Sequence, residues 1–106
     1  MKLFIDDVRQ APDGSWTVAR TPAEAIFAIE ESVLGTGEAI TEISFDHDLG
    51  RSPAGDEWTT RPVLIRLIEL DMQGLVETRP ATTVHSANPV GREWLEGMAS
   101  RYLPRE

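Results

Sequence analysis

The sequence predicts an α/β fold in which a four-stranded, mostly parallel sheet packs against about three helices. Four short apolar stretches alternate with three helical patterns, and turn residues separate most of them. This alternation is typical of parallel strands joined by helical crossovers. With 106 residues, of which 41% are hydrophobic and 26% charged, the chain is expected to form one domain over residues 1–106.

Four stretches are expected to form the strands of this sheet. The first is residues 2–5, and the second is residues 16–19, which follow a turn signal at residues 11–14. The third covers residues 40–45 and the fourth residues 81–84. The segment between the first two strands has no room for a helix, so a loop is expected there.

Three helices are expected from their start signals. Residues 21–24 (TPAE) form a capping box with a proline in the first turn, and this helix stops near Gly35. A second apolar helical pattern starts near Pro62, which should lie in the first turn because a proline deeper inside would break a hydrogen bond. Asn88 and Pro89 cap the third helix.

The charge and composition exclude several classes of function. A net charge of -8 argues against extended nucleic-acid binding, although a short phosphorylated ligand or the end of a strand remains possible. The absence of cysteine excludes disulfides and thiolate metal sites. No apolar run is long enough for a membrane span, and the first residues do not resemble a secretory signal, so a cytoplasmic protein is expected.

Acidic and imidazole side chains follow the ends of three predicted strands. The segments concerned are Asp6-Asp7, Asp46-His47-Asp48 and His85-Ser86. In open parallel sheets, ligands bind outside the carboxyl ends of the strands, and these ends meet at one edge. We therefore expect these carboxylates and both histidines of the chain to converge there.

Crowded carboxylates repel one another, and a bound cation or a raised pKa relieves the repulsion. We expect Asp6, Asp7 and Asp46 to hold a divalent metal, most readily Mg²⁺ or Mn²⁺, with Mn²⁺ favoured if an imidazole contributes. A structural alternative stays open for each residue. Asp6 and Asp7 would then be a solvated strand end, and Asp46 and Asp48 would form an Asx turn.

His47 and His85 are candidates for general acid and base, because imidazole titrates near neutral pH. Asp48 would orient an imidazole or complete the metal shell. The alternative is that each histidine is a structural residue hydrogen-bonded at the edge of the core.

Four residues are candidate contacts to phosphate oxygens. Ser86 and Asn88 lie at a helix start, where backbone N–H groups and the helix dipole attract anions. Arg92, in the first turn of that helix, and Arg9, after the first strand, would add guanidinium contacts. Alternatively, Ser86 and Asn88 only cap the helix and Arg92 is only solvated.

These motifs resemble the response-regulator receiver domain, in which an acidic pair and an aspartate bind Mg²⁺. They are more similar to a divergent relative, the cyclic-phosphate-processing receiver domain. The matching segments are LFIDDVR (3–9), WTVAR (16–20), DHDLG (46–50) and HSANPVGR (85–92). The resemblance implies a receiver-like (flavodoxin-like) three-layer sandwich that lacks the usual first helix and the fifth strand with its lysine.

The resemblance also implies a function, namely metal-assisted hydrolysis of cyclic phosphates by a phosphodiesterase-type enzyme. The substrate would be the 2′,3′-cyclic phosphate end of an RNA or a cyclic nucleotide. A non-catalytic receiver-like module that binds a nucleotide or a partner protein is the alternative, and phosphorylation on Asp46 is a third possibility. Replacing His47 and His85 singly would separate catalysis from binding, because a pure binder has no need of two imidazoles.

Overall fold

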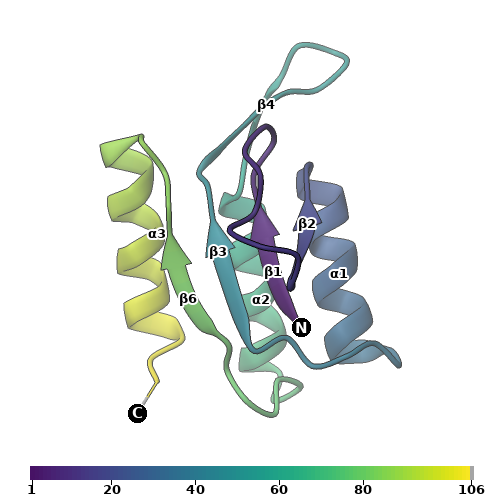
Figure 1. Ribbon diagram of the computed structural model, residues 1–106. Coiled ribbons are helices and arrows are strands. Elements are labelled where there is room, and N and C mark those ends of the chain that lie inside the picture. Colours follow the sequence, from purple (N-terminus) through teal and green to yellow (C-terminus); the bar gives the residue numbers. More distant parts are fainter. Residues whose placement is uncertain (106) are drawn as a thin grey trace.

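The computed structural model describes residues 1–105 and contains the expected alternation of strands and helices (Figure 1). The elements, in chain order, are β1 (Lys2–Ile5), β2 (Trp16–Ala19), α1 (Pro22–Leu34), β3 (Glu42–Phe45), β4 (Asp48–Arg51), β5 (Glu57–Thr59), α2 (Arg61–Met72), β6 (Ala81–Val84) and α3 (Pro89–Tyr102).

The four predicted strands form one parallel sheet in the order β2-β1-β3-β6. The predicted α/β architecture is thus confirmed. The strands are paired without stagger, since Ile5 is the partner of Ala19 and Phe45, and Phe45 is the partner of Val84. The residues that follow these four therefore leave the sheet side by side at its carboxyl edge.

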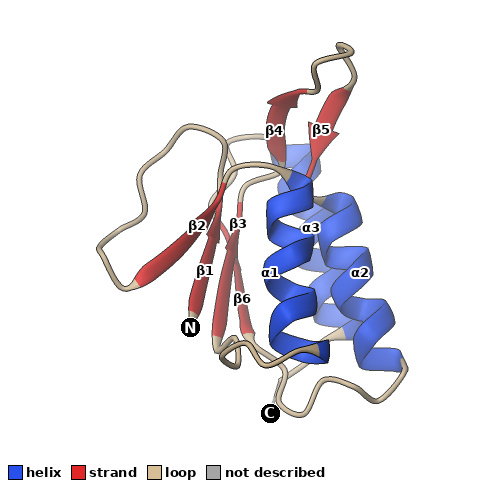
Figure 2. Cartoon of the chain, turned by 90° about the vertical axis from the view of Figure 1, so that its right-hand side faces the viewer, coloured by secondary structure: helices blue, strands red, loops and turns tan. Residues whose placement is uncertain are grey.

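All three helices lie on one face of the sheet, with α2 between α1 and α3 (Figure 2). Crossovers between parallel strands are almost always right-handed. The β2-to-β3 and β3-to-β6 connections run in the same direction across the sheet, so their helices cover the same face. The β1-to-β2 connection runs the other way and, as expected, contains no helix.

The sandwich therefore has two layers in residues 1–105, instead of the three that the resemblance implied. A helix between the first two strands would have covered the second face of the sheet. In its place, the loop between β1 and β2 crosses that face (Figures 1 and 2).

The core lies between the sheet and the helices. Leu3, Ile5 and Ile43 are fully buried and form one cluster with Ile29 of α1 and Leu64 of α2. Successive strand residues point to opposite faces, so these alternate strand positions define the helical side.

Local signals fix where the helices begin. The Thr21 hydroxyl accepts a hydrogen bond from the Glu24 N–H (3.1 Å), as in the predicted capping box, whereas the Glu24 carboxylate bonds the N–H of Arg20 instead of that of the cap residue (2.7 Å). Pro62 lies in the first turn of α2, as expected. No helix within residues 1–105 is long and apolar enough to cross a membrane.

The segment between β3 and α2, for which no strand was predicted, forms a β-hairpin. Strands β4 and β5 pair antiparallel, and the hairpin projects beyond the carboxyl edge of the sheet (Figure 2). A hydrogen bond from Arg51 Nη1 to the Gly55 carbonyl (2.9 Å) closes the turn, and Gly55 has a φ of 90°, which glycine adopts readily. The two strands are short and lack an alternating apolar pattern, which explains why the sequence did not reveal them.

Candidate metal and phosphate site

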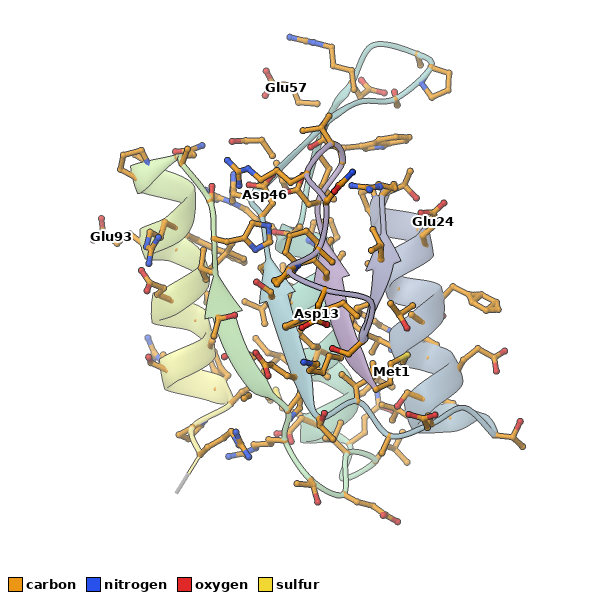
Figure 3. The ribbon with its side chains drawn as sticks, viewed as in Figure 1. Met1, Asp13, Glu24, Asp46, Glu57 and Glu93 are labelled. Carbon is orange, nitrogen blue, oxygen red and sulfur yellow. The ribbon has the colours of Figure 1, made fainter. Side chains whose placement is uncertain are left out.

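Three of the predicted site residues meet at the carboxyl edge of the sheet. Asp6, Asp46 and His85 follow β1, β3 and β6, and one ligand atom of each lies within 4.8 Å of the other two. Figure 3 shows Asp46 at the upper, carboxyl end of β3. The unstaggered pairing of the three strands explains this meeting, because each side chain follows the last paired residue of its strand.

The Asp6 carboxylate is fully buried and held by several donors. Its Oδ1 accepts hydrogen bonds from the N–H groups of Val8 and Arg9 (both 2.9 Å), and its Oδ2 lies 3.0 Å from Nε2 of His85. Burial disfavours the charged form, but these hydrogen bonds outweigh it and hold the pKa of Asp6 below its usual value. Asp6 is therefore ionised within the protein.

The Asp46 carboxylate is in the opposite electrostatic situation. Burial raises the pKa of Asp46, and the nearby charge of Asp6 adds to this effect, despite a hydrogen bond from the His47 N–H to Oδ1 (2.8 Å). The Asp46 carbonyl accepts a hydrogen bond from the Thr60 hydroxyl (2.6 Å), which ties the end of β3 to the start of α2. The site thus concentrates more negative charge than its own donors neutralise.

The His85 ring is fixed by three neighbours. Its Nδ1 lies 2.7 Å from the Ser44 hydroxyl, and its Nε2 lies 3.0 Å from Asp6 Oδ2. The ring also stacks on Phe4, with centroids 4.5 Å apart and planes 6° from parallel. Phe4 and Ser44 are register partners in β1 and β3, so the sheet itself positions the imidazole.

His47 lies outside this group and contacts the helical layer. It is 5% exposed, with Nδ1 3.0 Å from Asp48 Oδ1 and Nε2 accepting a hydrogen bond from Nε of Arg61 (2.9 Å). Because an arginine Nε–H only donates, Nε2 of His47 carries no proton and Nδ1 carries the proton that faces Asp48. Both ring nitrogens are therefore engaged within the protein.

Asp48, Asn88 and Ser86 form a second set of contacts that positions the start of α3. Asn88 Nδ2 donates to Asp48 Oδ2 (3.1 Å), while Asn88 Oδ1 accepts from the N–H groups at the start of the helix. The Ser86 hydroxyl accepts from the Asn88 N–H (3.1 Å). Burial opposes ionisation of Asp48, but hydrogen bonds from Asn88 and His47 lower its pKa. Asn88 thus caps α3, and Ser86 supports the cap residue.

The other three predicted residues are placed differently from one another. Arg9 joins the site, since its Nη1 donates to the His85 carbonyl (2.8 Å) and lies 3.6 Å from Asp6 Oδ2. Asp7 is half-buried, and its carboxylate lies beside Gly50 of the hairpin, but Asp7 is not among the three residues that could hold a metal ion together. Arg92 is exposed and donates to Glu96 on the same helix (3.2 Å).

Sequence reasoning missed four residues that support the site. They are Arg20, Ser44, Thr60 and Arg61. Arg20 Nη1 donates to the carbonyls of Asp6 (3.1 Å) and Arg9 (2.5 Å). Arg20 directly follows β2, and Ser44 precedes Asp46 by two residues on the same face of its strand, so both had a readable signal. Thr60 and Arg61 reach the site only through tertiary packing.

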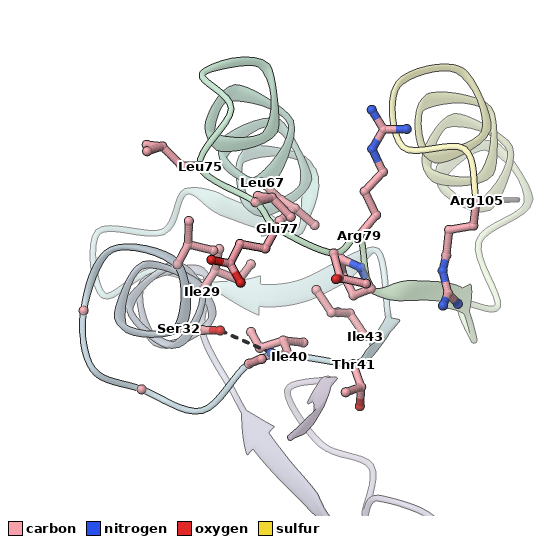
Figure 4. A pocket seen from close by; sticks show the side chains of 17 residues that line it. Ile29, Ser32, Ile40, Thr41, Ile43, Leu67, Leu75, Glu77, Arg79 and Arg105 are labelled. Atoms are coloured by element: carbon pink, nitrogen blue, oxygen red, sulfur yellow. Dashed lines mark hydrogen bonds between the residues drawn. The ribbon is translucent and has the colours of Figure 1, made fainter.

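A cavity of about 570 Å³ lies at the opposite end of the sheet, away from these residues (Figure 4). The ends of α1 and α2 and the start of β3 line it, and Ser32 Oγ accepts a hydrogen bond from the Ile40 N–H there (3.2 Å). Arg79 on its rim is already paired with Asp71 (3.1 Å). We place the site at the carboxyl edge because the convergent carboxylates and imidazole are there.

Comparison with known proteins identifies one family. No curated protein and no solved structure matches the chain significantly. The family described as the cyclic-phosphate processing receiver domain matches residues 1–101, which include all the residues of the site. The chain therefore belongs to the family of cyclic-phosphate processing receiver domains.

Proposed function

We propose that the protein is a metal-assisted phosphoesterase that opens cyclic phosphates, either the 2′,3′-cyclic phosphate end of an RNA or a cyclic nucleotide. The observation that carries this proposal is the approach of ligand atoms from Asp6, Asp46 and His85 to within 4.8 Å of one another. The name of the family adds cyclic phosphate as the substrate class.

The donor set fits a divalent metal. Two carboxylates suit Mg²⁺ or Mn²⁺, and an imidazole nitrogen moves the preference toward Mn²⁺. Burial and the charge of Asp6 raise the pKa of Asp46. A bound cation would relieve this unfavourable environment for the Asp46 carboxylate. Ser44 supports His85 as a third ligand, because a ligating imidazole usually has its other nitrogen hydrogen-bonded to a neighbour.

Opening a cyclic phosphodiester requires a positioned water, neutralised phosphoryl oxygens and a proton for the departing alkoxide. A bound divalent metal supplies a Lewis acid for the phosphoryl group and lowers the pKa of its water. The guanidinium of Arg9, beside Asp6 and His85, is positioned to bind a phosphoryl oxygen.

The two histidines have different roles in this proposal. His85 faces the carboxylates and is assigned as a metal ligand, with proton transfer at Nε2 as its alternative role. His47 was expected to share the acid and base work, but its two nitrogens already bond Asp48 and Arg61. We therefore assign His47 to positioning Asp48 and the start of α2.

Product release from a substrate panel tests the proposal. The panel contains 2′,3′- and 3′,5′-cyclic nucleotides and RNA with a cyclic phosphate end, each with and without Mn²⁺ or Mg²⁺. We expect a monophosphate product to form only when metal is present. The Asp46→Asn variant should not form it. Asp56→Asn, at an exposed position on the hairpin tip, is the matched control. If no substrate is turned over, the proposal fails and the chain is a non-catalytic binding module.

A further inference from the structure

Arg61, the first residue of α2, has an unusually fixed side chain. Its Nε donates to Nε2 of His47 (2.9 Å), and its guanidinium carbon lies 4.7 Å from the centre of the Trp94 ring on α3. Hydrogen bonding to an imidazole and stacking on an indole together define the plane of the guanidinium. The side chain is half-buried, so part of this charge is removed from water.

The Asp48 carboxylate lies near enough to the guanidinium of Arg61 to interact with its charge, but Arg61 is not bonded to any anion in residues 1–105. No carboxylate there forms an ion pair with it, and its terminal nitrogens donate no hydrogen bond. By contrast, the half-buried Arg66 and Arg79 are paired with carboxylates at 2.8 and 3.1 Å. The chain has 18 acidic residues against 10 basic ones, so a lack of available carboxylates does not explain the difference.

The terminal N–H groups of this partly buried guanidinium have no acceptor in residues 1–105, and the oxygens of an anionic ligand would accept hydrogen bonds from them. We propose that Arg61 forms a separate subsite that binds a phosphate group through its two terminal nitrogens. Nη1 and Nη2 form one edge of the guanidinium, and this edge matches two oxygens of a phosphate. Because His47 and Trp94 already hold the plane, little side-chain freedom is lost on binding.

The subsite lies on the other side of the β3 end from the candidate metal group. The Asp46 side chain joins Asp6 and His85, whereas the side chain of the next residue, His47, contacts Arg61 and the start of α3. A ligand that binds both sides through phosphate carries two phosphate groups. Given the proposed function, these are the cyclic phosphate and the adjoining phosphodiester of an RNA end. A cyclic mononucleotide has only the first.

Phosphate binding to the metal-free protein tests the subsite without any need for turnover. Inorganic phosphate is titrated in the presence of a chelator while the Trp94 indole and Arg61 Nε–H signals are followed by NMR. We expect a saturable shift and an affinity about tenfold lower in Arg61→Gln, which corresponds to about 1.4 kcal/mol. Arg61→Lys keeps the charge but loses the planar edge, so its affinity should also fall.

Arg101→Gln is the matched control, because Arg101 also lies over an aromatic ring, that of Tyr102, but at the far end of α3. It should bind phosphate like the unmodified protein. Thermal unfolding of each variant shows whether it is folded. If Arg61→Gln does not fold, the phosphate affinity of Arg61→Lys is compared with that of the unmodified protein. The proposal is overturned if phosphate causes no saturable shift, or if folded Arg61 variants bind it unchanged.

A second arm distinguishes the phosphodiester of a substrate from free phosphate. The KM of Arg61→Gln is compared for a dinucleotide with a cyclic phosphate end and for a cyclic mononucleotide. We expect an increase of about tenfold for the dinucleotide only. An equal increase for both substrates would overturn the assignment to the second phosphate. If phosphate binds at Arg61 but no substrate is turned over, the subsite stands and the proposed phosphoesterase activity fails.

Discussion

The imidazole ring of His47 packs directly against the backbone of Gly91, so closely that a Cβ at position 91 would lie within 3.0 Å of three ring atoms. Real Cβ atoms essentially never approach other heavy atoms this closely. The contact joins the DHDLG segment after β3 to the HSANPVGR segment that leads into α3. The glycine in the second segment is thus explained by the histidine in the first.

Replacing Gly91 by alanine should destabilise the protein. The ring is buried and bonded at both nitrogens, so it cannot move aside, and overpacking of this kind typically costs about 1–3 kcal/mol. The free energy of unfolding, measured in urea, reports the change. His47→Ala removes the ring, so the double variant should lose less stability than the sum of the two single variants.

Gly97→Ala provides the control for this cycle. Gly97 lies on the same helix, and a Cβ added there would meet no atom within 4 Å, so alanine should stabilise α3 by about 0.5–1 kcal/mol. Equal effects of the two substitutions, or strict additivity of Gly91→Ala and His47→Ala, would contradict the packing of His47 against α3.

Asp46→Asn should stabilise the metal-free protein while removing its response to metal. The pKa of Asp46 is raised in the folded state, so its charged form is penalised above that pKa, and the penalty fades as the pH falls through it. Asparagine removes the charge and keeps the oxygen that accepts from the His47 N–H. We expect a gain of about 0.5–2 kcal/mol at neutral pH in the presence of a chelator.

Chemical unfolding with and without Mn²⁺ measures both effects. The unmodified protein should gain stability with Mn²⁺ and the variant should not, because a ligand that binds only the folded state shifts unfolding by mass action. Asp56→Asn, which is exposed, should leave both quantities nearly unchanged. Lower stability of metal-free Asp46→Asn would show that the carboxylate is not a buried excess charge.

The convergence of Asp6, Asp46 and His85 could be predicted because it depends only on strand order and register. Parallel strands expose their carboxyl ends at one edge, and the last paired residues, Ile5 and Phe45, are in register. A pattern of short strands with polar ends therefore carried most of the information about the site.

The separation of the two histidines had a weaker signal in the sequence. Phe45 is buried in the core, so alternation directs Asp46 to the other face and His47 back to the helical side. The contacts of Thr60 and Arg61 had no such signal, because they depend on how α2 packs across the end of β3. The helix-free face of the sheet likewise follows from crossover direction, which requires the strand order.

In Asp6→Asn, the free energy of unfolding should change less between neutral and acidic pH than it does in the unmodified protein. The pKa of Asp6 is lowered in the folded state, so its contribution is complete above the pKa of the unfolded chain and is lost as the pH falls through the folded value. The difference in unfolding free energy between neutral and acidic pH should therefore be smaller in the variant. Removing a buried charged acceptor should also lower stability at neutral pH by about 1–3 kcal/mol.

The same measurement on Asp56→Asn provides the baseline for Asp6→Asn, because Asp56 is exposed on the hairpin tip. Other carboxylates with lowered pKa values, such as Asp48, titrate in both proteins and cancel in the comparison. An unchanged pH dependence in Asp6→Asn would mean that its hydrogen bonds do not favour the charged form.

Substitutions of the two histidines should have separate effects, one on metal affinity and the other on stability. His85→Asn removes an imidazole whose Nε2 faces Asp6, and the affinity for Mn²⁺ should fall by about tenfold or more. Ser44→Ala, which only removes the partner of Nδ1, should weaken binding less. His47→Ala should lower the unfolding free energy by about 2–4 kcal/mol, because it empties a buried and hydrogen-bonded position, but leave Mn²⁺ affinity nearly unchanged.

Titration with Mn²⁺ followed by electron paramagnetic resonance measures the affinities, and urea unfolding measures the stabilities. If His85→Asn binds Mn²⁺ as tightly as the unmodified protein, His85 is not a ligand. A reduced turnover with a shifted pH profile would then identify His85 as the proton carrier. If His47→Ala loses the metal instead, the assignment of the two rings to opposite sides of β3 is wrong, since of the two imidazoles it is that of His85 which contacts the Asp6 carboxylate.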